Sequence, residues 1–293
     1  MYELIQASEN CYYIDCPSKI GIIKINDKEV CLIDSGNNKD AGKKARKILD
    51  ANGWTLKMIL NTHSHGDHIG GNKYLQDQTN CKIYAPAIEC DFTNHTILEP
   101  AFLFGAYPPK ELRHKFLVAE ESKAEYLTSD ILPNGIEIIN LPGHFFDMVG
   151  FKKDDVIYLA DCLSSKATLD KYRIGVIYDV KAYLETLEKV KNMKAKLFIP
   201  SHAEATEDIT SLAQYNIDTV NEISNKILSI CKNPITFESL LQKLFDNYNL
   251  QMSFEQYALV GSTVKSYLVY LKEENKITAT FENNILLYQS IEE

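Results

Sequence analysis

Residues 63–68 hold three of the chain's seven histidines and an aspartate, within the stretch NTHSHGDHIGGN. The run TLKMIL just before this stretch has the pattern of a buried strand. Imidazoles held this close together repel one another when they are protonated, whereas a divalent cation turns the same crowding into binding. The sequence therefore predicts a metal site at the end of a buried strand.

Three further strand-like runs are followed by a residue that binds metals. The runs INLPG, VIYLA and LFIPS precede His144, Asp161 and His202. In sheets flanked by helices, side chains just beyond the strand ends gather in one crevice, so these residues are expected to converge. Imidazole and carboxylate ligands suit zinc, iron or manganese. The whole set exceeds what one tetrahedral ion uses and predicts two ions bridged by one carboxylate: His63, His65, Asp67, His68, His144, Asp161 and His202.

This ordered set resembles the metallo-β-lactamase superfamily of binuclear metallohydrolases. Its HxHxDH signature matches residues 63–68, and its later histidine, aspartate and histidine match His144, Asp161 and His202. The run LIDSG, residues 32–36, resembles the early aspartate motif of that family. The resemblance spans residues 1–205 and implies an α/β (α+β) fold, the αββα sandwich, in which two sheets lie between helical layers.

The resemblance also implies a role for each side chain. His63, His65 and His144 would hold the first ion, Asp67, His68 and His202 the second, and Asp161 would bridge the two. Asp34 would orient the ligand loop. The expected ions are two divalent metals, zinc first, with iron or manganese as alternatives.

Catalysis, on the same resemblance, would centre on Asp67 and Asp161. A hydroxide bridging the two ions would attack an ester, thioester or lactone bond of a small molecule, because metal coordination lowers the pKa of water to about 7.

The rest of the chain is patterned for both strands and helices. The runs CYYIDC, GIIKIN and EVCLID predict an antiparallel meander in the first 34 residues. Helices are predicted at 39–50, 69–77 and 179–194, and a strand at KIYA. Residues 206–293 show helical patterns at 216–231, at 237–248 and from 253, then a hairpin around Asn283-Asn284. They predict a small, helical, winged-helix-like domain.

Residues 91–130 lack a regular pattern and are rich in aromatic residues and proline. Long irregular connections are often lids or binding loops. Phe102, Phe104, Tyr107 and Phe116 belong either to a satellite apolar cluster or to a lid over the substrate, and Phe104 and Tyr107 are the substrate-binding candidates among them.

Other residues near the motifs have weaker signals. Lys166, Tyr172 and Arg173 follow Asp161 and are candidates for binding an anionic part of a substrate, with solvated loop residues as the alternative. Cys162 is expected to be buried as a small apolar residue. His95 and His114 match no motif and receive no role.

Charge argues against nucleic acid and membrane partners. The chain has 31 basic and 40 acidic residues, a net charge of -9, which repels polyanions. Residues 206–293 alone hold 6 lysines, no arginine and 12 acidic residues, so a protein-facing role such as a homodimer contact is preferred over DNA binding. Seven scattered cysteines without a CxxC pair, no signal-peptide pattern and no bilayer-length apolar segment predict a cytoplasmic protein.

The function expected from these features is metal-dependent hydrolysis of a small molecule. A thioester hydrolase similar to glyoxalase II shares the full ligand set, although the helical glutathione-binding tail of that enzyme is not evident here. The alternatives are a phosphodiesterase or endoribonuclease, an iron-dependent redox enzyme, and a ligand-sensing regulator with weak turnover. The fold does not choose among these chemistries.

Overall fold

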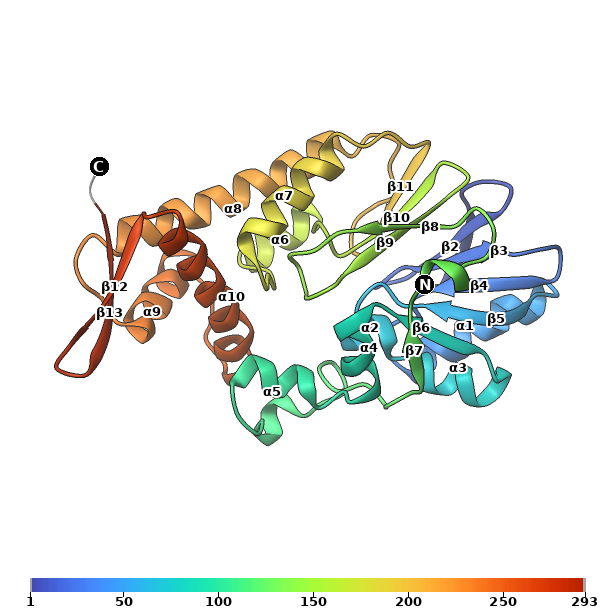
Figure 1. Cartoon of the computed structure of the whole chain (residues 1–293), viewed down its shortest axis with the longest axis horizontal. Helices are drawn as coiled ribbons and strands as arrows, with labels where there is room; N and C mark the ends of the chain where they lie inside the picture. Colours follow the sequence, from blue (N-terminus) through green and yellow to red (C-terminus); the bar gives the residue numbers. More distant parts are fainter. Residues whose placement is uncertain (1, 292–293) are drawn as a thin grey trace.

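The chain folds into two facing β-sheets with helices on their outer sides, followed by a helical region that ends in a hairpin (Figure 1). The computed structural model describes residues 2–291. The first sheet has seven strands in chain order: β1 (Glu3–Gln6), β2 (Cys11–Asp15), β3 (Ile20–Lys24), β4 (Glu29–Ile33), β5 (Thr55–Leu60), β6 (Lys82–Ala85) and β7 (Ala124–Tyr126). Strands β1 to β4 are antiparallel, which confirms the predicted meander, and β4 to β7 are parallel.

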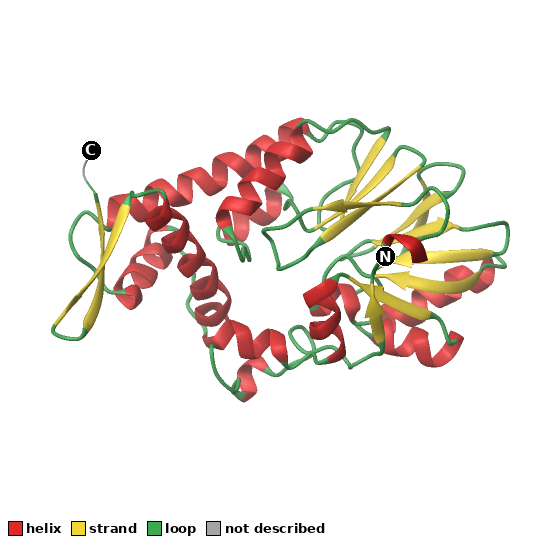
Figure 2. Ribbon diagram, viewed as in Figure 1, coloured by secondary structure: helices red, strands yellow, loops and turns green. Residues whose placement is uncertain are grey.

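The second sheet has four strands in the order β11-β10-β9-β8. They are β8 (Glu137–Asn140), β9 (Val149–Lys153), β10 (Val156–Ala160) and β11 (Leu197–Pro200). Helices α1 (Lys39–Ala51) and α3 (Asn72–Thr79) pack on the outer face of the first sheet. Helices α7 (Val180–Lys191) and α8 (Thr210–Ile230) pack on the outer face of the second. Figure 2 shows these layers, and the predicted αββα sandwich is confirmed.

The alternation of side chains along the strands divides the core into layers. In β3, Ile22 packs with Leu49 of α1, whereas Ile23 lies between the sheets. In β10, Tyr158 lies between the sheets, whereas Leu159 packs toward α7. Successive side chains of a strand point to opposite faces, so each strand contributes to two layers.

Tyr158 links the two sheets directly. Its hydroxyl donates a hydrogen bond to the carbonyl of Tyr12, at 2.9 Å, and lies 3.3 Å from the carbonyl of Ile22. Its ring occupies the space above Gly21, where a Cβ would come within 2.6 Å of the ring carbon Cε1. The strand pair at Gly21 therefore has room for the ring only because this residue has no side chain.

The helix predicted over 69–77 is α3, which begins at Asn72 and follows a short helix, α2 (Gly66–Ile69), with Gly70 and Gly71 between the two. A Cβ on Gly70 would lie 2.5 Å from the carbonyl carbon of Asn37, and one on Gly71 would lie 2.4 Å from the carbonyl oxygen of Ser35. The glycine pair thus lets the histidine-rich loop lie against the backbone that follows β4. The prediction placed the start of the helix three residues too early and its end two residues too early.

Residues 91–130 are more regular than predicted. They include the end of α4 (Ala87–Asn94), all of α5 (Leu98–Phe104), a short 3-10 helix (Lys110–Leu112) and β7. Leu103, Leu112 and Leu117 pack with Ala258 of α10 (Phe254–Glu273), so the segment joins the sandwich to the C-terminal helices. Of the four aromatic residues in the satellite-cluster interpretation, only Phe102 packs against this cluster, whereas Phe104, Tyr107 and Phe116 are exposed. The lid role stays a prediction.

The C-terminal region contains α8, α9 (Phe237–Asn247), α10 and a hairpin of β12 (Ile277–Glu282) and β13 (Ile285–Ser290). Helix α8 begins at Thr210, six residues before the predicted start. Asn283 and Asn284 have φ angles of 51° and 65°, which is the conformation of a tight hairpin turn. Apolar residues of α8 and α10 form one continuous cluster with those of β10 and α7. The boundary at residue 206 and the winged-helix likeness stay predictions. No helix within residues 2–291 is long and apolar enough to cross a membrane.

We expect Gly21→Val to lower the free energy of unfolding by about 1–3 kcal/mol, because the added side chain overlaps the ring of Tyr158. Tyr158→Phe removes only the hydroxyl and should cost about 1 kcal/mol. Urea unfolding measures both changes. Gly175→Ala is the matched control, because nothing lies within 4 Å of an added Cβ there. A Gly21→Val protein as stable as wild type would contradict this packing.

Candidate metal centre

The structure brings all seven predicted ligands together where both sheets end. Their ligand atoms form three overlapping groups, within each of which all atoms lie inside 4.8 Å of one another. The groups are His63, His65 and His144; His63, His68 and Asp161; and Asp67, His68 and His202. They come from the loops after β5, β8, β10 and β11 and from α2, so the expected convergence of distant residues is observed.

The first group has the spacing of a tetrahedral site. Nδ1 of His65 lies 3.2 Å from Nε2 of His63 and 3.1 Å from Nε2 of His144. A zinc ion bound to nitrogens at about 2.0–2.1 Å separates its ligands by about 3.4 Å in a tetrahedron. The three nitrogens are therefore nearly in place for one ion.

The contacts around Asp67 and Asp161 combine histidines with carboxylates. Nε2 of His202 lies 3.1 Å from Oδ2 of Asp67 and 3.2 Å from Oδ2 of Asp161. Nε2 of His68 lies 3.2 Å from Oδ1 of Asp161, and Nε2 of His144 lies 3.7 Å from Oδ2. Asp161 thus lies between the group of His63, His65 and His144 and the group of Asp67, His68 and His202. Its Oδ1 atom is buried and accepts no hydrogen bond from any residue in the described range.

The outer nitrogens of four histidines face hydrogen-bond acceptors. Nδ1 of His144 lies 2.9 Å from the carbonyl of Val176, and Nδ1 of His202 lies 2.9 Å from the carbonyl of Pro17. Nδ1 of His68 lies 2.8 Å from the carboxylate of Asp34. A carbonyl or carboxylate only accepts, so each of these Nδ1 atoms carries the hydrogen.

His63 follows the same rule through a threonine. The hydroxyl of Thr62 donates its one hydrogen to Oδ2 of Asp34, at 2.7 Å. It therefore accepts from Nδ1 of His63, which lies 3.0 Å away.

These tautomers leave the inner nitrogens bare. In the neutral imidazoles, the Nε2 lone pairs of His63 and His144 face Nδ1 of His65. Those of His68 and His202 face the oxygens of Asp161 and Asp67. A proton or a metal ion can occupy the space between these atoms, and neutral imidazole with carboxylate is a donor set that zinc, iron and manganese bind. The residues present therefore fit a pair of divalent ions.

The pKa values differ between the histidines that face other histidines and the histidine that faces carboxylates. Burial and the neighbouring His68 and His65 hold the pKa of His63 well below its ordinary value, and burial with repulsion from His144 lowers that of His65 to about 3. Burial also disfavours the charge on His202, but Asp161 and Asp67 outweigh it and raise the pKa to about 10. Protons thus take the place of a cation only beside the carboxylates.

Asp34 connects β4 to the ligand loop. Its φ of 61° turns the chain sharply after the strand. Its carboxylate accepts from the backbone N–H of Thr62 at 2.8 Å, from the hydroxyl of Thr62, and from Nδ1 of His68. The predicted role of orienting the loop is consistent with these contacts.

Gly143 positions His144. It has a φ of 117°, and a Cβ there would lie 2.2 Å from the backbone nitrogen of Tyr183. Its carbonyl accepts from the N–H groups of Tyr178 and Asp179, at 2.9 and 3.0 Å. Only glycine allows the loop to approach the start of α7 this closely.

Two buried glutamates near the centre were not found from the sequence. Glu89 of α4 accepts hydrogen bonds from the N–H and hydroxyl of Ser64 and from the N–H of Asp147. Burial nevertheless raises its pKa to about 7. Glu99 of α5 is buried 3.9 Å from Nε2 of His65, and burial raises its pKa well above its ordinary value. A lone glutamate in a helical segment has no signal that distinguishes it from a solvated one.

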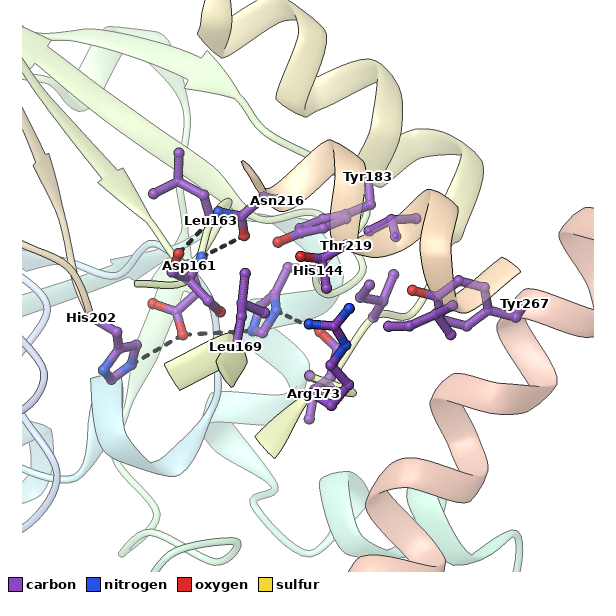
Figure 3. A pocket seen from close by; sticks show the side chains of 16 residues that line it. His144, Asp161, Leu163, Leu169, Arg173, Tyr183, His202, Asn216, Thr219 and Tyr267 are labelled. Carbon is purple, nitrogen blue, oxygen red and sulfur yellow. Dashed lines mark hydrogen bonds and ion pairs between the residues drawn. The ribbon is translucent and has the colours of Figure 1, made fainter. Parts of the chain in front are cut away.

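A cavity extends from the metal centre toward the C-terminal helices (Figure 3). His144, Asp161 and His202 line one end, and Tyr267 of α10 lines the other. Arg173, just after α6 (Lys166–Tyr172), also lines it. Arg173 has φ 59° and ψ −59°, and the N–H of Ile174 donates to the carbonyl of Tyr172 at 2.7 Å. This is the rare, strained form of the γ-turn, which costs about 1–3 kcal/mol.

The other substrate-binding candidates do not line this cavity. Phe104 packs against Phe254, with ring centroids 5.8 Å apart, and Tyr107 is exposed beside Arg113. Lys166 lies over the ring of Tyr215, and Tyr172 is exposed. Their substrate-binding role stays a prediction.

Cys162, His95 and His114 lie in the environments expected for them. Cys162 is fully buried, as predicted. His95 is exposed, and His114 lies 3.5 Å from a carboxylate oxygen of Glu255, so both are outside the three ligand groups.

Comparison with known proteins gives a consistent family. The family model described as the metallo-beta-lactamase superfamily matches residues 10–202. A hydroxyacylglutathione hydrolase from Prochlorococcus marinus is 24% identical over 229 residues, which cover 75% of this chain and 80% of that protein. Another, from Methylococcus capsulatus, is 54% identical over 41 residues, which cover 14% of this chain and 16% of that protein. The chain thus spans less than two thirds of the length of several curated relatives that it matches.

Solved structures extend the likeness over nearly the whole chain. A beta-lactamase domain protein from Burkholderia ambifaria has a TM-score of 0.76 at 15% identity, covering 99% of this chain and 94% of that one. A metallo-beta-lactamase family protein from Thermus thermophilus has a TM-score of 0.70 at 17% identity, covering 99% of this chain and 98% of that one. At these identities the likeness shows the fold alone.

We expect Asp34→Asn to weaken binding of the ion held by His68 by about 10- to 100-fold. An amide nitrogen replaces one of two oxygens that both accept hydrogen bonds, so the loop and the His68 tautomer lose their support. Competition with a chromophoric chelator measures the affinity. Asp27→Asn is the matched control, because the Asp27 carboxylate is fully exposed. Equal affinity in Asp34→Asn and wild type would contradict the role given to Asp34.

Proposed function

The chain belongs to the metallo-β-lactamase superfamily, and on this premise we propose that it is a metal-dependent hydrolase of small-molecule thioesters. Members of this superfamily typically bind two divalent metal ions. We propose zinc as the native metal and the seven clustered side chains as its ligands, with the division inferred from the sequence: His63, His65 and His144 on one ion, Asp67, His68 and His202 on the other, and Asp161 between them.

One observation carries the proposal: four histidines whose Nδ1 atoms face hydrogen-bond acceptors direct their Nε2 atoms at His65 and at two carboxylates. A site that only stabilised the fold would have its polar atoms paired with one another. Here Oδ1 of Asp161 is buried and accepts no hydrogen bond within residues 2–291. Divalent cations would satisfy this arrangement, and the cavity beside it would give a small substrate access to them.

The two metal ions would supply Lewis acidity, which makes water a nucleophile near neutral pH and polarises the scissile carbonyl. The chain's own groups position the reactants. Asp161, with a side chain 11% exposed, lies between the two ligand groups and fixes their separation. Asp67, 33% exposed, is the more accessible carboxylate, and in this proposal it accepts the proton of the attacking water.

The relatives favour a thioester over other bonds. The hydroxyacylglutathione hydrolases of Prochlorococcus marinus and Methylococcus capsulatus are named for thioester substrates, and the former aligns along most of both chains. The net charge of -9 disfavours RNA and DNA as substrates. A phosphodiesterase remains the alternative to test.

We expect the zinc-loaded protein to hydrolyse short acyl thioesters. A chromogenic disulfide that reacts with the released thiol measures the rate. His65→Ala should lower kcat/KM by about a thousandfold, because loss of a ligand removes several kcal/mol of charge stabilisation. His95→Ala is the matched control and should retain full activity, since His95 is exposed and outside the ligand groups.

The same protein, loaded in parallel with zinc, manganese or iron, is assayed on lactones, phosphodiesters and RNA. Hydrolysis of a phosphodiester or RNA, but of no thioester, would contradict the proposal. Equal activity of His65→Ala and His95→Ala would contradict the assignment of the site.

A further inference from the structure

We propose that the cavity between the metal centre and α10 is an acyl-binding subsite, in which Tyr267 and Arg173 bind an uncharged oxygen near the far end of a short acyl chain. The substrate class is a thioester of a short hydroxyacyl or oxoacyl group. This inference rests on the proposed thioesterase function, which it deepens by naming the acyl group.

The cavity is placed to receive an acyl group whose carbonyl lies at the metal ligands. His144, Asp161 and His202 line its inner end, and Tyr267 of α10 lies at its other end. Figure 3 shows the Arg173 side chain between these two ends. An acyl chain that starts at the metal centre therefore points toward the C-terminal helices.

Two polar atoms that line this space have no partner. The hydroxyl of Tyr267, a fully buried residue, and Nε of Arg173 are both buried and make no hydrogen bond within the described part of the chain. Buried polar groups in folded proteins are nearly always paired, so two unpaired ones in one cavity need an explanation. Nε of Arg173 can only donate and the hydroxyl of Tyr267 can donate, so an acceptor oxygen is a partner that suits both.

The charge of the cavity favours an uncharged acceptor. Nη2 of Arg173 lies 2.8 Å from Oε2 of Glu222, and the hydroxyl of Tyr248 donates to the same oxygen at 3.0 Å. The guanidinium charge is thus already compensated by a carboxylate. A hydroxyl or keto oxygen fits the two remaining donors, whereas a second carboxylate would bring an additional negative charge beside Glu222.

The size and the rest of the lining limit the acyl chain. The cavity has a volume of about 50 Å³, which is room for about four water-sized groups. Its remaining walls are largely apolar, with Leu163, Leu169 and Val220 among them. A short hydrocarbon chain with one oxygen near its end matches both properties. The C-terminal helices therefore contribute directly to substrate recognition, through Val220 on α8 and Tyr267 on α10.

The first test measures binding alone. The probes are 3-hydroxybutanamide and butanamide, which differ only in the hydroxyl and lack a thioester. Ligand-observed NMR titration of the zinc-loaded protein should show roughly tenfold tighter binding of the hydroxylated amide. Tyr267→Phe should bind the two amides equally, and Tyr270→Phe, the same change on the same helix outside the cavity, should keep the preference.

Stability separates recognition from a structural role. The Tyr267 hydroxyl makes no hydrogen bond in the described structure, so Tyr267→Phe should unfold at the same urea concentration as wild type or a higher one. Equal binding of both amides by wild type, or a preference retained in Tyr267→Phe, would overturn the subsite.

Kinetics then distinguish the subsite from the function on which it rests. The N-acetylcysteamine thioesters of 3-hydroxybutanoate and butanoate should differ about tenfold in kcat/KM for wild type and not at all for Tyr267→Phe. Equal hydrolysis of both thioesters by wild type overturns the subsite and leaves the thioesterase standing. Discrimination between the amides without hydrolysis of either thioester overturns the thioesterase and leaves the subsite standing.

Discussion

The structure depends on one electrostatic constraint: the imidazole nitrogens and carboxylate oxygens of seven side chains are held close to one another in a largely buried site. Nδ1 of His65 lies within 3.2 Å of two Nε2 atoms, and Nε2 of His202 lies within 3.2 Å of two carboxylate oxygens. Where neither a proton nor a metal ion lies between them, lone pairs at this distance repel strongly in a buried site, where the effective dielectric is low. Divalent ions reverse the sign of that interaction, so the same contacts that burden the metal-free fold would stabilise the loaded one.

Close packing in the sandwich holds the ligand loops in place. Close approaches that only glycine permits fix the loops, with Gly70 and Gly71 against the backbone after β4 and Gly143 against α7. Asp34 then ties the turn after β4 to Thr62 and His68. Between the sheets, the Tyr158 ring packs over Gly21 and its hydroxyl bonds to the carbonyl of Tyr12, which links the second sheet to the first. Packing distant from the ligands therefore determines their geometry.

The ligand positions were predictable because spacing and strand ends encode them. The HxHxDH run placed four ligands, and the strand-like runs before His144, Asp161 and His202 placed the other three at the same edge. The αββα architecture followed from resemblance. The start of α3 was predicted three residues early, and the close approach of Gly70 and Gly71 to Asn37 and Ser35 was not anticipated, because a contact between distant segments has no local signal.

Features that depend on long-range packing were not predictable. Glu89 and Glu99 lie in ordinary helical segments, and nothing local distinguishes a buried glutamate from a solvated one. Tyr267 lies about a hundred residues from Asp161 in the chain, and only the packing of α10 brings it to the same cavity. Arg173 was a candidate from its position after Asp161, but its strained turn and its pairing with Glu222 appear only in the fold.

The most direct measurement is the number of divalent ions that the chain holds. Elemental analysis of protein saturated with zinc and then desalted should give two ions per chain for wild type. Removal of one ligand from either group, in His65→Ala or His202→Ala, should leave one. A wild-type protein that retains one ion or none would contradict the paired-ion centre on which the account rests.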